Sequence, residues 1–228
     1  MNKLKINDMV IYYQKSGSGK PVILVHGNGE DHTIFKTEME QLVSAGYCVY
    51  APDSRGHGKT GAHNPPVTAF HYANMADDIY QLIKALNLEK PAYYGHSDGG
   101  IIGLLLELRH PETLGVMAVS GTNLSPEGLD ETFVAECRKI YEKSPEPLTA
   151  LMLNEPNIEP HELENIHIPV LVTVGEYDLI KKQETKTIAK HLSKGKLIIV
   201  ENADHGNYVV NSEIMGELLI QFLAENRY

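Results

Sequence analysis

The sequence predicts an α/β fold with a mostly parallel sheet and helices on both of its faces. Short runs of β-type residues alternate with helical patterns along most of the chain, as right-handed β-α-β crossovers require. Several strand candidates, such as residues 21–25, are apolar throughout, which is typical of strands buried on both faces. The 228 residues suffice for one large domain that buries well over half of its unfolded surface.

The first half of the chain supplies the N-terminal strands and the first helices. Residues 4–17 predict a hairpin or meander with Asn7 and Asp8 at the turn, followed by the buried strand 21–25. Apolar residues at helical spacing predict a helix over 34–43, which Ala45 and Gly46 end. A strand over 47–53, a Gly-rich loop over 54–66 and a strongly amphipathic helix over 72–86 follow.

The second half continues the alternation with one interruption. Strands are predicted at 91–95, 114–120, 169–175 and 196–201, and helices at 101–110, 184–192 and 214–223. Residues 121–168 contain no convincing strand; one helix face runs from about 129 to 140, and proline-rich turns follow. We therefore predict a core in two parts, 1–120 and 169–228, interrupted by a small helical cap at 121–168.

The charge pattern excludes several classes of partner. The formal net charge is -10, whereas nucleic acids and anionic membrane surfaces attract basic patches. Ten acidic and three basic residues place much of this charge on the predicted insert. We interpret them as a solvated acidic surface, with repulsion of anionic substrates as the alternative.

The same composition gives expectations for compartment and cofactors. The N-terminus lacks the apolar region of a secretory signal, and the longest apolar run is too short to span a bilayer. Cys48 and Cys137 lie far apart in sequence and predict buried free thiols in a reducing cytosol. Neither CxxC nor HExxH spacing occurs. The chain is therefore expected to be cytoplasmic and to need no metal or cofactor.

The sharpest motif is the Gly95-His96-Ser97-Asp98-Gly99-Gly100 segment, which matches G-x-S-x-G. It lies directly after a predicted strand and directly before a predicted helix, where a nucleophile elbow must lie. Its glycines permit a tight turn that holds the serine hydroxyl above the sheet edge. This context predicts that Ser97 is a nucleophile.

A serine nucleophile needs a base and an acid that orients the base. Asp178 and His205 each follow a predicted strand, and the catalytic residues of open α/β sheets gather at the carboxyl ends of strands. Glu176 stands two residues early, and Asp204 adjoins the base too closely to reach its far nitrogen. We therefore predict that His205 is the base and Asp178 the orienting acid.

The turn after residues 21–25 supplies the third element. Its residues are His26-Gly27-Asn28-Gly29, and the glycine positions let the backbone approach a ligand. A tetrahedral intermediate needs two N–H donors, which we assign to the backbones of Asn28 and Asp98. His26 and His96 are expected to fix loops or to line the wall of the substrate pocket, and Gly27 is expected at that wall.

Taken together, these motifs resemble the α/β-hydrolase superfamily over nearly the whole chain. The segments that carry the resemblance are HGNG, DSRGHGKT, GHSDGG, GEYD and NADHG. The resemblance implies an α/β-hydrolase enzyme with an eight-stranded sheet and a cap inserted after the sixth strand. Asn28 stands where an aromatic or aliphatic residue is frequent, which suggests one polar pocket wall. Asp204 replaces the common glycine before the histidine, a departure that the sequence does not explain.

The expected reaction is hydrolysis of a small carboxylic ester or related acyl compound through an acyl-enzyme intermediate. The same residues also serve thioester, lactone and C–C bond hydrolysis, because the fold does not fix the reaction. GHSDGG also resembles the elbow of hydrolases that cleave amino-acid esters, whose cationic group an acidic cap would suit. A ligand sensor with slow turnover is the alternative from a different class.

Overall fold

Eight strands form one sheet in the computed structural model, which describes residues 1–6 and 9–228. The strand order is β1-β2-β4-β3-β5-β6-β7-β8; β2 runs antiparallel to both of its neighbours and all other pairs are parallel. The strands are β1 (Asn2–Ile6), β2 (Met9–Gly17), β3 (Lys20–Val25), β4 (Tyr47–Pro52), β5 (Ala92–His96), β6 (Val116–Ser120), β7 (Val170–Gly175) and β8 (Gly195–Val200). The predicted fold class is confirmed, while the turn predicted at Asn7 and Asp8 lies outside the described residues.

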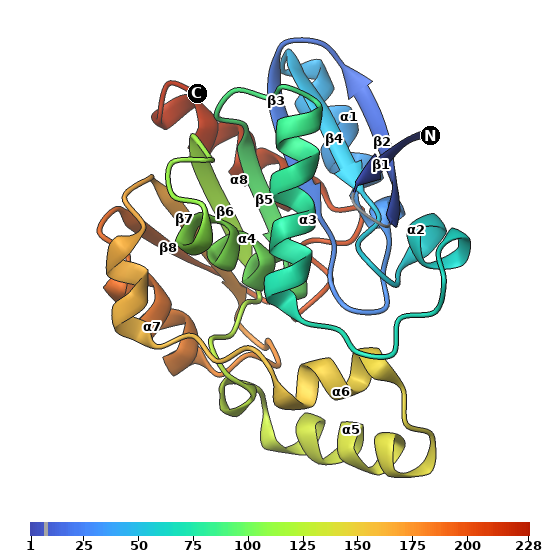
Figure 1. Cartoon of the computed structure of the whole chain (residues 1–228). Coiled ribbons are helices and arrows are strands. Elements are labelled where there is room, and N and C mark those ends of the chain that lie inside the picture. The colour runs from blue at the N-terminus through green and yellow to red at the C-terminus, as the bar shows by residue number, and fades with distance from the viewer. Residues whose placement is uncertain (7–8) are drawn as a thin grey trace.

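Helices cover both faces of this sheet (Figure 1). One face packs against α1 (Lys36–Ser44) and α8 (Glu213–Glu225), and the other against α3 (Tyr72–Ala85), α4 (Asp98–Arg109) and α7 (Lys182–His191). The remaining helices are α2 (Gly58–His63), α5 (Glu131–Lys143), α6 (Pro147–Asn154) and the short 3-10 helices η1 (His32–Phe35), η2 (Pro126–Gly128) and η3 (Pro160–Asn165). In the part of the chain that is described, no helix is both long and apolar enough to cross a membrane.

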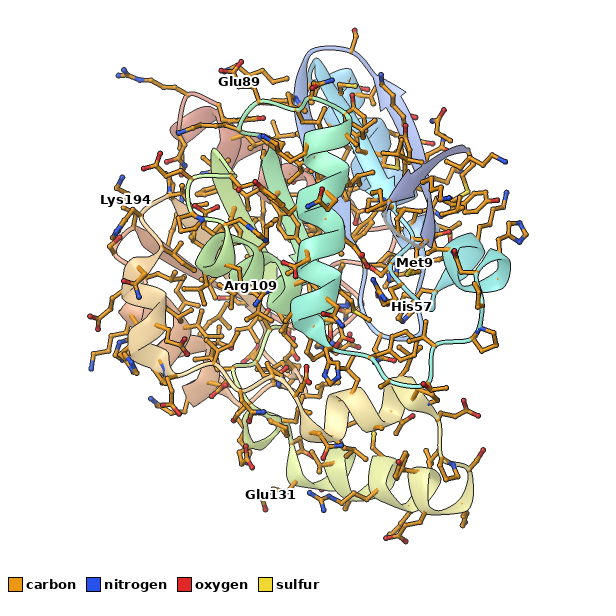
Figure 2. The ribbon with its side chains drawn as sticks, viewed as in Figure 1. Met9, His57, Glu89, Arg109, Glu131 and Lys194 are labelled. Carbon is orange, nitrogen blue, oxygen red and sulfur yellow. The ribbon has the colours of Figure 1, made fainter. Side chains whose placement is uncertain are left out.

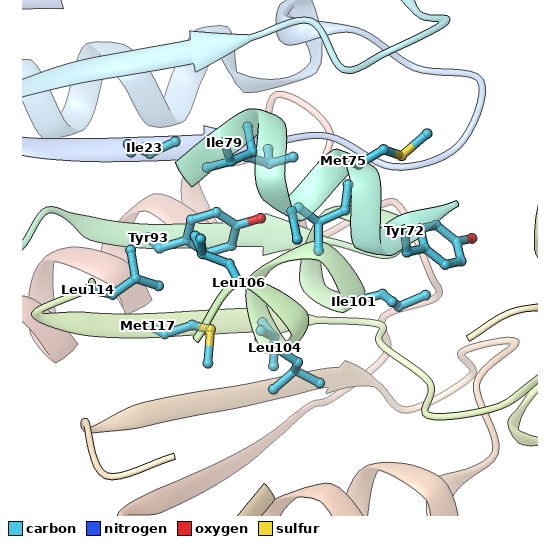
Figure 3. Close-up of a cluster of buried hydrophobic side chains, with 14 of the residues drawn as sticks. Ile23, Tyr72, Met75, Ile79, Tyr93, Ile101, Leu104, Leu106, Leu114 and Met117 are labelled. Carbon is cyan, nitrogen blue, oxygen red and sulfur yellow. The ribbon is translucent and has the colours of Figure 1, made fainter. Parts of the chain in front are cut away.

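The central strands are apolar on both sides because each side meets a different hydrophobic core. In β3, Val22 and Leu24 join the core beneath α1 and α8, whereas Ile23 and Val25 join the core beneath α3 and α4. Figure 3 shows the second core, in which side chains of α3 and α4 meet Tyr93 of β5 and Met117 of β6. These cores fix the carboxyl ends of the parallel strands, from which the candidate site is built.

Four helical elements, η2, α5, α6 and η3, occupy residues 121–169 between β6 and β7, which we call the inserted segment. Figure 1 shows α5 and α6 side by side, away from the sheet. Figure 2 shows Glu131 at the start of α5 pointing outward, and its side chain is 91% exposed. Such exposure is consistent with a solvated acidic surface, and the alternative role in repelling anionic substrates stays a prediction.

One helix lies where the sequence predicted only a loop. Helix α2 falls within residues 54–66, whose glycines have low helix propensity. Asp53 offsets that cost by accepting a hydrogen bond from the backbone N–H of Lys59 at 2.8 Å. Thr60 then joins α2 to the sheet, because its hydroxyl accepts from the backbone N–H of Tyr12. The loop prediction was wrong here because contacts distant in sequence outweighed local propensity.

A buried carboxyl on α1 gives a prediction for stability. Glu38 is fully buried and its Oε1 accepts from the backbone N–H of Ser212, while its Oε2 has no partner among the described residues. Burial raises the pKa of Glu38 to about 7. The folded chain therefore keeps a proton that the unfolded chain releases near its ordinary pKa of 4.5, so stability is lost as pH rises from about 4.5 to 7.

Glu38→Gln is expected to raise the free energy of unfolding at pH 8 by roughly 1–3 kcal/mol, because the uncharged amide pays no cost of ionisation in the core. The measurement is urea unfolding at pH 5 and at pH 8. Glu40→Gln, an exposed position on the same helix, is the control and is expected to change neither value. An equal effect of Glu38→Gln at both pH values would contradict the assignment.

Candidate active site

Three side chains converge from the carboxyl ends of β5, β7 and β8. His205 places Nε2 3.1 Å from Ser97 Oγ and Nδ1 2.7 Å from Asp178 Oδ1. Ser97 directly follows β5, Asp178 follows β7 and His205 follows β8, so the parallel sheet brings together residues more than 100 positions apart. The structure thus joins all three residues that the sequence predicted as nucleophile, base and acid.

The backbone at Ser97 is strained, as the elbow motif predicts. Its φ is 52° and its ψ is -116°, a conformation that a residue with a Cβ rarely adopts. The turn is tight enough that a Cβ on Gly95 would collide with the backbone of Gly99. The strand-to-helix junction is fixed further by hydrogen bonds from Ser97 N–H to the Ser120 carbonyl and from Gly100 N–H to the Ser97 carbonyl.

Asp178 is held by three hydrogen bonds and its side chain is 1% exposed. Oδ1 accepts a hydrogen bond from the backbone N–H of Ile180 at 2.9 Å and lies 2.7 Å from Nδ1 of His205. Oδ2 accepts from the backbone N–H of Gly175 at 3.3 Å. These bonds fix the carboxylate at the Nδ1 edge of the imidazole. The rival acid, Glu176, instead accepts from the backbone N–H of Asn202.

Gly121 is a residue of this site that sequence reasoning missed. Its φ is +56°, and a Cβ there would lie 2.7 Å from Cε1 of His205 and 3.4 Å from Oδ2 of Asp178. Only a glycine therefore leaves room for the imidazole beside the end of β6. Its position directly after a strand, next in line to Asp178 and His205, was the available signal.

The structure gives Asp204 a role that the sequence did not explain. Its Oδ1 accepts from the backbone N–H groups of Gly206 and Asn207, at 2.9 and 2.8 Å, and these bonds hold its pKa below the ordinary value. Asn207 closes the turn by accepting from the backbone N–H of Asp204. Asp204 thus stabilises the turn that carries His205. A glycine at this position has no side chain and could not accept these hydrogen bonds.

The turn after β3 lies against the nucleophile. Glu30 accepts from the backbone N–H of Gly27 through Oε2 at 2.8 Å, and the Glu30 N–H donates back to the Gly27 carbonyl. Asn28 lies between them, and Asp98 begins α4, so the Asp98 N–H has no acceptor within the helix. These are the two backbones assigned to the oxyanion.

A cavity of about 320 Å³ opens over the nucleophile. The inserted segment and the loop after β7 supply its apolar wall. The lining residues are Gly27, Asn28, Glu30, His96, Ser97, Asp98, Asn123, Leu129, Phe133, Met152, Leu179 and His205. Among the described residues that line it there is no lysine or arginine, so its charge is acidic.

The predicted pocket residues divide into two groups. Gly27 and His96 line the cavity, but His26 does not. The His26 ring is 1% exposed, accepts from the backbone N–H of Ser54 at 2.9 Å through Nε2, and places Nδ1 at the Gly27 carbonyl. Of the two roles expected for His26, the pocket wall is corrected, and the residue instead fixes two loops to each other.

Burial shifts the pKa of several groups around the nucleophile. It raises the pKa of Asp98 to about 6, against the opposing effects of Tyr72 and Asn28. It also raises the pKa of Glu30, despite the hydrogen bond from Gly27. The pKa of His96 falls well below its ordinary value, so this histidine is neutral beside His205, whose ring centroid lies 4.9 Å away.

One cluster elsewhere has the residue types of a metal site. The possible ligand atoms of Asp31, His32 and Asp53 lie within 4.8 Å of one another. Asp53 already accepts from the His32 backbone at 3.1 Å and from the Lys59 backbone at 2.8 Å, and its Oδ1 lies 2.6 Å from the His32 ring. These internal bonds explain the cluster as a support for two loops.

Comparisons with known proteins support a common fold. A family model for the alpha/beta hydrolase fold matches residues 20–136. The human serine hydrolase BPHL is 26% identical over 250 residues, covering 97% of this chain and 85% of that protein. A thermophilic esterase from Thermogutta terrifontis has a TM-score of 0.82 at 21% identity over 100% of both chains. The meta-cleavage product hydrolase CumD from Pseudomonas fluorescens has a TM-score of 0.82 at 19% identity, covering 99% of this chain and 98% of that one.

Proposed function

The chain is an enzyme of the α/β-hydrolase family, and from that premise we propose that it cleaves a small carboxylic ester or related acyl compound through an acyl-enzyme intermediate. The observation that carries the proposal is the continuous hydrogen-bonded arrangement from Ser97 through His205 to Asp178. A base within reach of a serine, and an acid that fixes the base, are what nucleophilic acyl transfer needs.

In the first half of the reaction, Ser97 Oγ attacks the ester carbonyl carbon and passes its proton to Nε2 of His205. Asp178 holds the other ring nitrogen and stabilises the imidazolium that forms. The backbone N–H groups of Asn28 and Asp98 bind the oxyanion. When the tetrahedral intermediate collapses, the alcohol leaves with the proton from His205, and the acyl group remains on Ser97.

In the second half, His205 accepts a proton from water, and the oxygen of that water attacks the acyl carbon. Collapse of the second intermediate releases the carboxylic acid, and Ser97 recovers its proton from His205.

We propose that the inserted segment acts as a cap in both halves of the reaction. Support for this role comes from Leu129, Phe133 and Met152, which line the cavity over the nucleophile.

The test is hydrolysis of p-nitrophenyl esters from acetate to decanoate. Turnover of the short esters is expected, because a cavity of about 320 Å³ accommodates only a small acyl group and alcohol. Absence of turnover on the whole panel, with a ligand-dependent rise in thermal stability, would instead favour the ligand sensor. Thioester, lactone and C–C bond hydrolysis would be tested next in that case.

A second candidate, favoured by the charge of the cavity, is an ester that carries a cationic group. Glu30 and Asp98 both line the cavity, and no basic residue among the described ones lines it with them. With a pKa of about 6, Asp98 is mostly ionised near pH 7.5. An ammonium group near this carboxylate would gain a charge-assisted hydrogen bond. An amino-acid ester has such a group next to its reactive carbonyl.

Asp98→Asn is expected to lower kcat/KM for L-alanine benzyl ester about 10- to 100-fold relative to propanoate benzyl ester, because only the first carries an ammonium group. Both products are measured by chromatography at pH 7.5. The variant keeps the Asp98 backbone N–H, so the uncharged ester reports any general damage to catalysis. An equal loss on both esters would rule out recognition of the cation by this carboxylate.

A further inference from the structure

The two residues assigned to the oxyanion hole are joined to each other by their side chains. Nδ2 of Asn28 donates to Oδ2 of Asp98 at 3.1 Å. The same nitrogen also donates to the backbone carbonyl of Leu148 at 3.2 Å. Leu148 lies in the first turn of α6. One amide thus connects the turn after β3, the start of α4 and the inserted segment.

The surroundings make this amide costly to remove. The Asp98 side chain is buried, and a buried acceptor that loses its donor retains its desolvation cost without compensation. The Tyr72 hydroxyl also lies near this carboxylate. The second acceptor of the Asn28 amide is the Leu148 carbonyl, in the first turn of α6. A carbonyl oxygen can accept two hydrogen bonds, so this one can accept from Asn28 as well as from a backbone N–H of its own helix.

We propose that the Asn28 side chain is a positioning residue, which sets the spacing of the two oxyanion donors and ties them to α6. This inference rests on the proposed function. An oxyanion hole works only when its donors lie about 2.7–3.1 Å from the charge that develops. A side-chain bond between the two donor residues limits their relative motion, and the Leu148 bond connects the same amide to α6.

A second tether at the other end of α6 offers a matched control. Glu155 directly follows α6, places Oε1 2.6 Å from Nδ1 of His71, and accepts from the backbone N–H of Tyr72 through Oε2 at 3.1 Å. Glu155→Ala therefore removes one attachment of α6 to the core without changing the turn after β3. This variant distinguishes the effect of a more mobile α6 from the effect of a changed spacing between the two oxyanion donors.

The experiment compares Asn28→Leu and Asn28→Ala with Glu155→Ala and the wild type. Three quantities are measured: kcat and KM for p-nitrophenyl acetate, the inhibition constant of butylboronic acid, and amide hydrogen exchange across residues 147–154. The boronic acid forms a tetrahedral adduct on Ser97 and therefore reports the oxyanion hole. Thermal unfolding shows that each variant is folded, and the alanine variant covers the case in which leucine is too bulky.

Both Asn28 variants are expected to lower kcat about 10- to 100-fold and to weaken the boronic acid by a similar factor, with KM changing less than about threefold. Exchange in α6 is expected to accelerate in these variants and in Glu155→Ala. Glu155→Ala is expected to keep the boronic acid affinity within about twofold of the wild type.

Two results would overturn the inference. Wild-type kcat and boronic acid affinity in folded Asn28 variants would show that the amide does not set the donor spacing. An equal weakening of the boronic acid by Glu155→Ala would assign the effect to α6 alone. Failure of the proposed function is a different result, because the wild type itself would then neither hydrolyse the esters nor bind the boronic acid.

Discussion

Replacing Ser97 by alanine is expected to abolish turnover of the p-nitrophenyl esters, lowering kcat by at least about 10⁴-fold. The reason is the position of Oγ, 3.1 Å from Nε2 of His205, where no other hydroxyl of the described cavity lining stands. Without this oxygen no acyl-enzyme forms, and only a slow attack by water remains, aided by binding and by the oxyanion donors. The measurement is initial rate against ester concentration at pH 7.5.

The same variant is expected to keep its thermal midpoint, because among the described residues the Ser97 hydroxyl forms one hydrogen bond, with His205. Alanine also has a Cβ, so it adopts the positive φ at this position at a cost similar to that of serine. Ser193→Ala is the control, since the Ser193 hydroxyl also makes one hydrogen bond, to the Ile166 carbonyl. Retained turnover in Ser97→Ala would exclude this serine as the nucleophile.

Much of this architecture could be predicted because local patterns and the fold point to the same answer. The apolar run in β3 predicted a strand buried on both faces, and the two cores on either side of it confirm this. Ser97, Asp178 and His205 could each be placed at the end of a predicted strand. The topology of a parallel sheet then requires those ends to lie at one edge.

The parts that the sequence did not predict depend on contacts between distant segments. Helix α6 lies in a stretch interpreted as proline-rich turns, because Pro147 suggests a turn as readily as the first position of a helix. Its neighbours in sequence left His26 either at the pocket wall or in a loop-fixing role, and the hydrogen bond from the Ser54 N–H, 28 residues away, decides for the second. The bridge from Asn28 to Leu148 spans 120 residues, and no local pattern indicates such a pair.

The orientation of His205 depends on the Asp178 carboxylate, and replacing that carboxylate gives the other large expected effect. Asp178→Asn is expected to lower kcat for p-nitrophenyl acetate about 10³- to 10⁴-fold. The hydrogen bonds of Asp178 show why neither orientation of the new amide is satisfactory. Oδ1 receives His205 and the Ile180 N–H, while Oδ2 receives the Gly175 N–H, so both oxygen positions face donors.

If the amide nitrogen of the variant faces His205, it donates to Nδ1 and leaves the proton on Nε2, where the ring cannot accept the proton of Ser97. If the nitrogen faces Gly175, the correct tautomer survives, but two donors oppose each other and no negative charge stabilises the imidazolium. Nitrogen-15 NMR of the His205 ring distinguishes these cases, because it shows which nitrogen carries the proton. Both cases lower the rate, so a loss of kcat is expected whichever of them prevails.

Glu176→Gln is the matched control, because Glu176 lies two residues from Asp178 and binds the Asn202 backbone instead of His205. It is expected to keep wild-type kcat. A reversal, with Asp178→Asn active and Glu176→Gln inactive, would transfer the acid to Glu176 and would require the loop after β7 to rearrange during the reaction. The three hydrogen bonds that hold Asp178 oppose such a rearrangement, because breaking them would leave a buried carboxylate without donors.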